Sequence, residues 1–178
     1  MTELSPLISE LLPPAVPAGE EAWTEVRPFP DTGTKSSFVS GNPNSGAIRV
    51  RYFARKGLGD FIGRAWFGPE TEGPPGHAHG GSQAALLDEG MGAAAWTAGH
   101  PVLAAKLEVN FRKSLPLRTH VEVRANVERI EGKKVFVRGS LVGLDGTVYS
   151  ESAGLFVVID TAALLARVKA RSENPERP

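Results

Sequence analysis

The chain has 178 residues, which is enough for one compact domain and short for two of ordinary size. Its 20 lysines and arginines equal its 20 aspartates and glutamates. With a formal charge of zero, a basic surface for nucleic acid or for a membrane is not expected. The chain contains no cysteine, which excludes disulfides, thiolate metal ligands and a thiol nucleophile.

The N-terminal segment, residues 1–34, is predicted to form a short helix followed by an arm. Residues 4–12 have an amphipathic pattern, and Pro13 and Pro14 would end the helix because proline lacks an amide donor. The stretch that follows is rich in Pro, Gly and Glu, and suggests either a wrapping arm or a partly disordered leader. The chain begins without a basic region before an apolar run, and no run approaches the roughly 18 apolar residues of a membrane span. We therefore expect a soluble cytoplasmic protein.

Residues 35–160 are predicted to form one domain of antiparallel strands around one principal helix. The strand candidates are rich in Val, Ile, Phe, Thr and Tyr, and apolar residues alternate with charged ones in several of them. Short turns, including an Asp-Gly hairpin signal at Asp145, separate the strands that follow the helix. The candidate strands are residues 36–40, 47–55, 60–67, 102–114, 120–130, 133–144 and 147–159.

Residues 161–178 are predicted to form a second helix and a charged tail. Asp160 or Thr161 would cap this helix, which continues to about Arg171. The order of elements therefore predicts an α+β protein with an antiparallel sheet and one principal buried helix.

The predicted central helix, residues 82–98, has apolar side chains around most of its circumference and contains Asp88 and Glu89 in its middle. Such a helix is expected to be buried. A buried carboxylate without partners is costly or has a raised pKa, so it must be paired or lie near an aqueous cleft. Asp88 is therefore a candidate functional acid. The alternative is that both acids mark a solvated edge of the helix, and Glu89 fits this structural interpretation better than Asp88 does.

The start of this helix offers a second candidate group. Amides at Gly80 and Gly81 would be unpaired and would lie at the positive end of the helix dipole, where they suit a carbonyl oxygen that becomes an oxyanion. Gly81 and Asp88 lie on the same side of the helix but roughly 10 Å apart along its axis. One carbonyl group cannot contact both, so two antiparallel copies of the helix across a two-fold axis are expected if both groups act.

The two histidines before the helix, His77 and His79, form an H-x-H pattern without a suitable third ligand nearby. We therefore predict no metal site. His79 is expected to order the turn by a hydrogen bond to the backbone, or else to line the pocket.

Three ordered motifs resemble the hotdog-fold acyl-CoA thioesterases of the phenylacetate-pathway (PaaI-like) type. They are HGGSQAALLDEGMG at residues 79–92, NPNSGAIRVRYF at residues 42–53 and LEVNFRKSLPL at residues 107–117. The resemblance covers roughly residues 38–158. It implies a hotdog fold, in which an antiparallel sheet wraps around one long helix. It also implies hydrolysis of an acyl-CoA to a free acid and coenzyme A without a cofactor, in a homodimer or a dimer of dimers.

The same resemblance implies roles for individual residues. Asp88 matches the acid that acts as general base or nucleophile, and Gly81 matches the backbone amide that polarises the thioester carbonyl. His79 belongs to the same catalytic motif. Coenzyme A carries phosphates, so basic residues are expected near the pocket mouth, although each could equally be a solvated edge. The predicted substrate-binding residues are Asn44, Gly80, Ser82, Ala104, Arg112, Lys113 and Lys134.

One departure from the family pattern keeps a second function open. Some relatives have Thr or Ser sixteen residues after the acid, where this chain has Ala104. The attacking water would then be held by Ser82, Gln83 or another side chain. Alternatively, the protein binds an acyl thioester without turning it over, as a sensor or scaffold. A hydratase or dehydratase is less favoured, because those relatives place Asp and His together in the helix region. Met91, Ala95 and Trp96 are interpreted either as acyl-pocket residues or as core.

Overall fold

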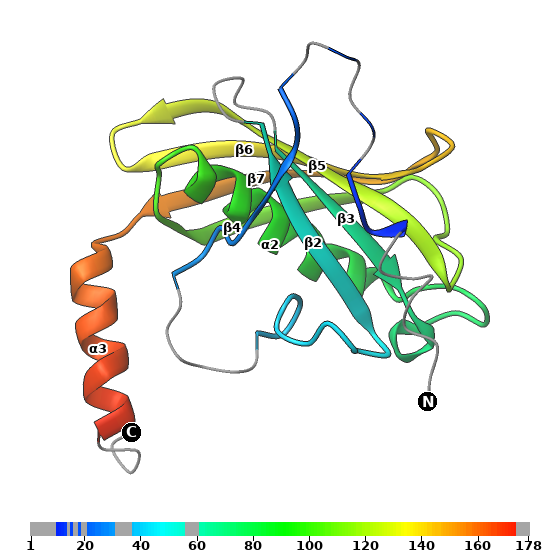
Figure 1. Cartoon of the computed structure of the whole chain (residues 1–178), viewed down its shortest axis with the longest axis horizontal. Coiled ribbons are helices and arrows are strands. Elements are labelled where there is room, and N and C mark those ends of the chain that lie inside the picture. The colour runs from blue at the N-terminus through cyan, green and yellow to red at the C-terminus, as the bar shows by residue number, and fades with distance from the viewer. Residues whose placement is uncertain are drawn as a thin grey trace.

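The computed structural model describes residues 10–13, 15, 18, 21–30, 37–55 and 61–173. Within these ranges the chain forms one seven-stranded antiparallel sheet that wraps around a long helix (Figure 1). The elements are β1 (Thr24–Val26), β2 (Ile48–Ala54), β3 (Phe61–Phe67), the 3₁₀ turn η1 (Pro69–Thr71), α2 (Gly80–Thr97), β4 (Val102–Phe111), β5 (Thr119–Glu131), β6 (Lys134–Gly143), β7 (Val148–Val158) and α3 (Thr161–Glu173). The predicted α+β architecture is confirmed.

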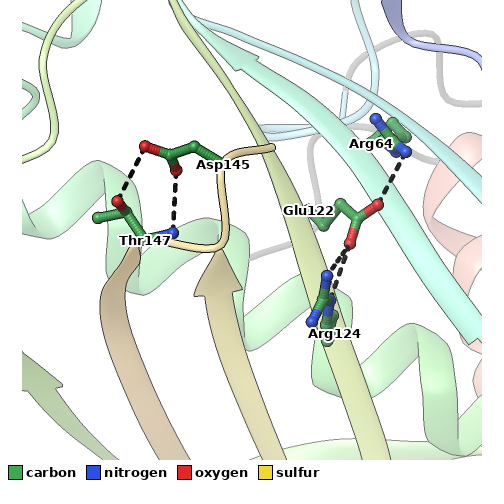
Figure 2. Close-up of polar contacts among 5 residues, drawn as sticks. All are labelled: Arg64, Glu122, Arg124, Asp145 and Thr147. Carbon is green, nitrogen blue, oxygen red and sulfur yellow. Dashed lines mark hydrogen bonds and ion pairs between the residues drawn. The ribbon is translucent and has the colours of Figure 1, made fainter. Parts of the chain in front are cut away.

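The strands lie in the order β1-β2-β3-β5-β6-β7-β4, and every neighbouring pair is antiparallel. Strand β4 follows α2 in the sequence but pairs with β7, so it forms one edge of the sheet. A register shift between Ala104 and Lys106 marks a bulge near its start. The predicted hairpin turn at Asp145 is confirmed, because the Thr147 N–H and hydroxyl both donate to its carboxylate (Figure 2).

Helix α2 is the centre of the core, as its apolar circumference predicts. Leu86, Leu87 and Met91 are fully buried against the sheet. A side chain at Gly90 would place its Cβ 2.3 Å from Val123 Cγ1 on β5, so the helix backbone lies closer to the sheet than any larger residue would allow. Met91 and Ala95 are both fully buried in a hydrophobic core cluster, which agrees with their interpretation as core residues.

The described part of the predicted N-terminal arm packs on the domain. Strand β1 pairs with β2 and extends the sheet. The Phe29 ring lies edge-on to the Trp96 ring of α2, with 6.1 Å between ring centroids. The helix predicted at residues 4–12 lies almost wholly outside the described residues.

The strand predicted at residues 36–40 is wrong for residues 37–40, which form a turn. The Gly41 N–H donates to the Ser37 carbonyl at 3.2 Å and closes this turn. Gly41 is required there, because a Cβ would lie 2.0 Å from the Ser37 nitrogen. We refer to residues 37–41 as the 37–41 turn.

The predicted C-terminal helix is confirmed as α3, which projects away from the sheet (Figure 1). The Ala163 N–H donates to Asp160 Oδ1 at 3.1 Å, as expected for a helix cap. The end of the predicted charged tail, residues 174–178, lies outside the described residues. No helix in the described ranges is long and apolar enough to cross a membrane.

Candidate active site

The start of α2 is organised by His79, which occupies the N-cap position. Its Nδ1 accepts a hydrogen bond from the Gly81 N–H at 2.8 Å, and its carbonyl accepts one from the Ser82 hydroxyl at 2.7 Å. The His79 N–H in turn donates to the Thr71 carbonyl of η1. The predicted hydrogen bond of His79 to the backbone is thus confirmed. The prediction of two unpaired amides is therefore wrong for Gly81, whose N–H donates to His79, while the Gly80 N–H has no hydrogen-bond partner among the described residues.

Asp88 lies two turns further along α2 and is partly buried. Its Oδ1 atom is shielded from solvent and makes no hydrogen bond in the described structure. Burial raises the pKa of Asp88 above its usual value, because the charged form loses hydration without gaining a partner. Among the described residues Asp88 is therefore a carboxylate without a partner, and its surroundings strengthen it as a base.

Asp88 opens into a cleft with a volume of about 260 Å³, which we name the Asp88 cleft. Apart from two carboxylates its lining is apolar, and three of its side chains are phenylalanines. The lining consists of Phe29, Phe38, Val39, Ala85, Asp88, Glu89, Gly92, Val102, Leu103, Ala104 and Phe156. Ala104, sixteen residues after Asp88, thus lies in the same cleft as the acid, on β4.

Glu89, the other acid of α2, has both carboxylate oxygens occupied. Its Oε1 accepts a hydrogen bond from the Tyr52 hydroxyl at 3.0 Å, and its Oε2 accepts one from the Ser37 hydroxyl at 3.1 Å. Burial, and secondarily the Glu89 charge, raise the pKa of Tyr52 well above its usual value, so its hydroxyl stays protonated and donates. These contacts agree with the structural interpretation of Glu89.

The most buried acid outside α2 has a different environment from Asp88. Glu122 on β5 is 7% exposed, and it lies between two guanidinium groups (Figure 2). Arg64 approaches one of its oxygens at 2.8 Å and Arg124 approaches the other at 2.6 Å. Glu122 is therefore a paired structural carboxylate, and Asp88 remains the better candidate for chemistry.

The other predicted binding residues do not line the Asp88 cleft of the same chain. Arg112 forms an ion pair with Glu151 at 2.7 Å, and Lys113 and Lys134 are exposed. Asn44 lies in an exposed turn where its N–H donates to Asn42 Oδ1. The helix-start residues are also absent from the lining of the cleft. Of the predicted site residues, only Asp88 and Ala104 therefore line the Asp88 cleft of a single chain.

Several cleft residues were missed by sequence reasoning. Phe29 and Phe38 come from segments predicted as an arm and as a strand, and no sequence pattern marks them as neighbours of α2. Phe156 could have been found from the alternation of β7, which turns its side chain toward the helix. Among the described residues, no group of three or more His, Asp or Glu side chains is placed to hold a metal ion.

Part of the chain is similar to proteins of a known family. Residues 75–150 match the model of the thioesterase superfamily. The chain is 35% identical over 94 residues to acyl-coenzyme A thioesterase THEM4 of Bos taurus. The matched region covers 52% of this chain and 38% of that protein. It is 37% identical over 91 residues to acyl-coenzyme A thioesterase THEM5 of Mus musculus, covering 51% of this chain and 37% of that protein. The matched region thus spans less than half the length of these curated relatives.

Solved structures agree on the fold. A thioesterase superfamily protein superposes with a TM-score of 0.61 at 29% identity, covering 67% of this chain and 58% of the other. The Escherichia coli PaaI protein of the phenylacetic acid degradation operon superposes with a TM-score of 0.56 at 14% identity, covering 64% of this chain and 80% of the other. A hypothetical thioesterase from Streptococcus pneumoniae with coenzyme A gives 0.56 at 14% identity, covering 62% and 87%. Residues 75–150 are thus similar to the thioesterase superfamily, and the chain has the hotdog fold that these solved thioesterase structures share.

Proposed function

We propose that the protein hydrolyses an acyl-CoA thioester to a free acid and coenzyme A. The observation that carries this proposal is the unpaired Asp88 carboxylate, with its raised pKa, at the wall of an otherwise mainly apolar cleft. An apolar cleft of this size suits an acyl group rather than a whole acyl-CoA molecule. The names of the relatives, acyl-coenzyme A thioesterases, support the same reaction.

In this reaction Asp88 acts on water or on the thioester itself. As general base it removes a proton from a water molecule, whose oxygen attacks the carbonyl carbon. The tetrahedral intermediate then collapses, the carbon–sulfur bond breaks, and the thiolate of coenzyme A takes up a proton. As nucleophile, Asp88 instead attacks the carbonyl carbon, the carbon–sulfur bond breaks with release of the coenzyme A thiolate, and water hydrolyses the resulting acyl-enzyme anhydride to the free acid and the Asp88 carboxylate. A carboxylate with a raised pKa is a stronger base once it is ionised, which favours the first route.

The oxyanion needs a donor that one chain does not place beside Asp88, and we propose that a second copy supplies it. The Phe111 ring, at the end of β4, lies against Gly80, because a Cβ there would be 3.0 Å from it. Ala104, near the start of β4, lines the same cleft as Asp88. Antiparallel pairing of two β4 edges therefore brings the helix start of one chain toward the Asp88 cleft of the other.

In this homodimer the amides at the start of α2 polarise the thioester carbonyl. The Gly80 N–H, which has no partner among the described residues, is the available donor, whereas the Gly81 N–H, the predicted donor, can serve only after it leaves His79 Nδ1. Arg112 and Lys113 directly follow Phe111, so the same pairing carries them toward the mouth of the other chain's cleft. We keep them, with Asn44 and Lys134, as proposed contacts for the phosphates and polar groups of coenzyme A.

A second function, binding of acyl-CoA without turnover, is favoured by one observation. Ala104, which lines the cleft together with Asp88, has no hydroxyl to hold a water molecule. If the Ser82 and Gln83 side chains do not replace it, the substrate would bind without being hydrolysed.

The two functions are separated by assaying the purified protein with acetyl-, hexanoyl-, palmitoyl- and phenylacetyl-CoA. Thiol release is followed with a chromogenic thiol reagent, and binding is measured by calorimetry with a non-hydrolysable thioether analogue of each substrate. The thioesterase predicts release of free coenzyme A and the acid from at least one of these substrates. Tight binding of the analogues without thiol release from any thioester would support the sensor and overturn the thioesterase.

A further inference from the structure

Glu89 is a carboxylate of the Asp88 cleft that has no role in the proposed reaction. It is adjacent to the proposed base, lies in the same cleft, and yet both of its oxygens accept hydrogen bonds from other side chains. A carboxylate engaged at both oxygens is poorly placed to act on a substrate. Its two partners come from segments that are far apart in the sequence, so it connects them.

The first partner, Tyr52, is packed tightly in the core. It is 4% exposed on β2, and its ring stacks on Phe61 with 5.5 Å between ring centroids. Gly63 on β3 leaves the space that the Tyr52 ring occupies, since a Cβ there would lie 2.9 Å from Tyr52 Cδ1. The hydroxyl of Tyr52 is therefore held in one position, and it holds Glu89 Oε1.

The second partner, Ser37, begins the 37–41 turn. The turn has one buried side chain, Val39, which is 4% exposed, and one highly exposed side chain, Phe38, which is 90% exposed and forms part of the Asp88 cleft. Val39 fixes one side of the turn in the core. The hydrogen bond from the Ser37 hydroxyl to Glu89 Oε2 fixes the other side to α2.

We propose that Glu89 is a positioning residue that fastens the 37–41 turn to α2, so that Phe38 forms a wall of the Asp88 cleft for the acyl chain. This inference rests on the proposed function, because it takes the Asp88 cleft as the acyl site. Glu89 acts through Ser37 on Phe38 and takes no part in the chemistry. A long acyl chain reaches the Phe38 wall, whereas an acetyl group next to Asp88 does not need it.

The test compares Glu89→Ala with the conservative variant Glu89→Gln, using acetyl-CoA and decanoyl-CoA as substrates. We expect Glu89→Ala to raise KM for decanoyl-CoA about tenfold, with a smaller change in kcat and in the KM for acetyl-CoA. Glu89→Gln keeps an oxygen that accepts from Tyr52 and an amide that donates to Ser37, so it restores most of the decanoyl-CoA affinity. Ser37→Ala should act in the same direction as Glu89→Ala, but less strongly.

A double-mutant cycle with Phe38→Ala shows whether Glu89→Ala changes the KM for decanoyl-CoA through the position of Phe38. We expect Phe38→Ala alone to raise KM for decanoyl-CoA, and Glu89→Ala to add little to it in the double variant. An equal loss of kcat on both substrates, an unchanged KM for decanoyl-CoA, or fully additive effects of the two substitutions would each overturn the proposal. Thermal unfolding of every variant separates these outcomes from loss of the fold.

Binding of S-decyl-coenzyme A, a thioether that cannot be hydrolysed, tests the wall without turnover. The proposal predicts that Glu89→Ala and Phe38→Ala both raise its Kd about tenfold, and that Glu89→Gln does not. If the protein releases no thiol but these Kd values change as expected, the proposed hydrolysis fails and the positioning role stands. If thiol release is normal and the Kd values do not change, the reverse holds.

Discussion

Asp88 and Glu89 are neighbours in α2, yet their carboxylates have opposite surroundings. Glu89 accepts hydrogen bonds from Tyr52 and Ser37, whereas a buried oxygen of Asp88 has no hydrogen-bond partner in the described structure. The unpaired acid costs the protein stability, and such a cost is typical of groups retained for function. This difference is the reason why we propose a chemical role for Asp88 and a positioning role for Glu89.

The free energy of unfolding that the protein loses by burying the Asp88 carboxylate depends on pH, so this loss can be measured. Its pKa is raised in the folded protein, so between the unfolded and the folded pKa the folded state binds more protons, and stability falls as pH rises. The cost is absent below the unfolded pKa and is complete above the folded one. We expect Asp88→Asn to have a higher Tm than the wild type at neutral pH, with a difference that shrinks on acidification. A variant with a lower Tm at neutral pH, or a difference independent of pH, would contradict this assignment.

At the scale of elements, α2 and β5 approach so closely that only glycine fits at position 90. A Cβ at Gly90 would lie 2.3 Å from Val123 Cγ1, which is too short for two carbon atoms. Glycine at position 90 thus lets the sheet pack closely on the helix.

The substitution Gly90→Ala tests this close approach. Alanine gains up to about 1 kcal/mol in helix propensity over glycine, but overpacking against β5 costs about 1–3 kcal/mol, so we expect a net loss of about 1 kcal/mol. In a Val123→Ala background the clash is removed, and the same substitution should become stabilising. Urea unfolding of the four variants measures both effects. Equal effects of Gly90→Ala in the two backgrounds would refute the contact.

Much of the fold follows from local patterns in the sequence. The apolar circumference of α2 predicts its burial, the alternation along β2 and β4 predicts strands, and the cap at Asp160 predicts the start of α3. The 37–41 turn was mistaken for a strand because Phe38 and Val39 have high strand propensity. The hydrogen bond from the Gly41 N–H to the Ser37 carbonyl closes a turn in spite of that propensity, and no alternation pattern in the sequence indicates this turn.

The site was only partly predictable, because its parts are brought together by tertiary packing. Asp88 stands out in the sequence as an acid in an apolar helix. The spacing to Ala104 came from family resemblance, and the cleft that they share depends on the pairing of β4 with β7. Phe29 and Phe38 reach the cleft from segments without regular secondary structure, so neither periodicity nor a motif marks them.

At the scale of the whole molecule, the free edge of β4 is the feature that the proposed dimer uses. Strand β4 has ten residues, pairs only with β7 in the described sheet, and carries exposed Leu103 and Phe111 side chains. A long edge strand of this kind has backbone N–H and C=O groups that can pair with a strand of another chain. Pairing with a second copy would cover it and complete two sites at once.

The charges on β4 make this pairing testable. A two-fold axis near Leu107, the middle of the strand, places Lys106 of one chain opposite Glu108 of the second copy, and the reverse. Lys106→Glu would create two repulsive cross-strand pairs and weaken the dimer about tenfold. The double swap Lys106→Glu with Glu108→Lys should restore it. Sedimentation at several concentrations measures both, and a wild-type protein of single-chain mass, or a double swap as weak as the single variant, would exclude this pairing.

The most direct test of the account is the rate of thiol release from the best acyl-CoA substrate by the wild type and by Asp88→Asn. Replacement of the general base by an amide of the same shape should lower kcat by about 10²–10⁴-fold. The variant's folded state is checked by its Tm and by binding of the thioether analogue, which should be retained. Turnover by Asp88→Asn at the wild-type rate would contradict the central claim that Asp88 drives hydrolysis.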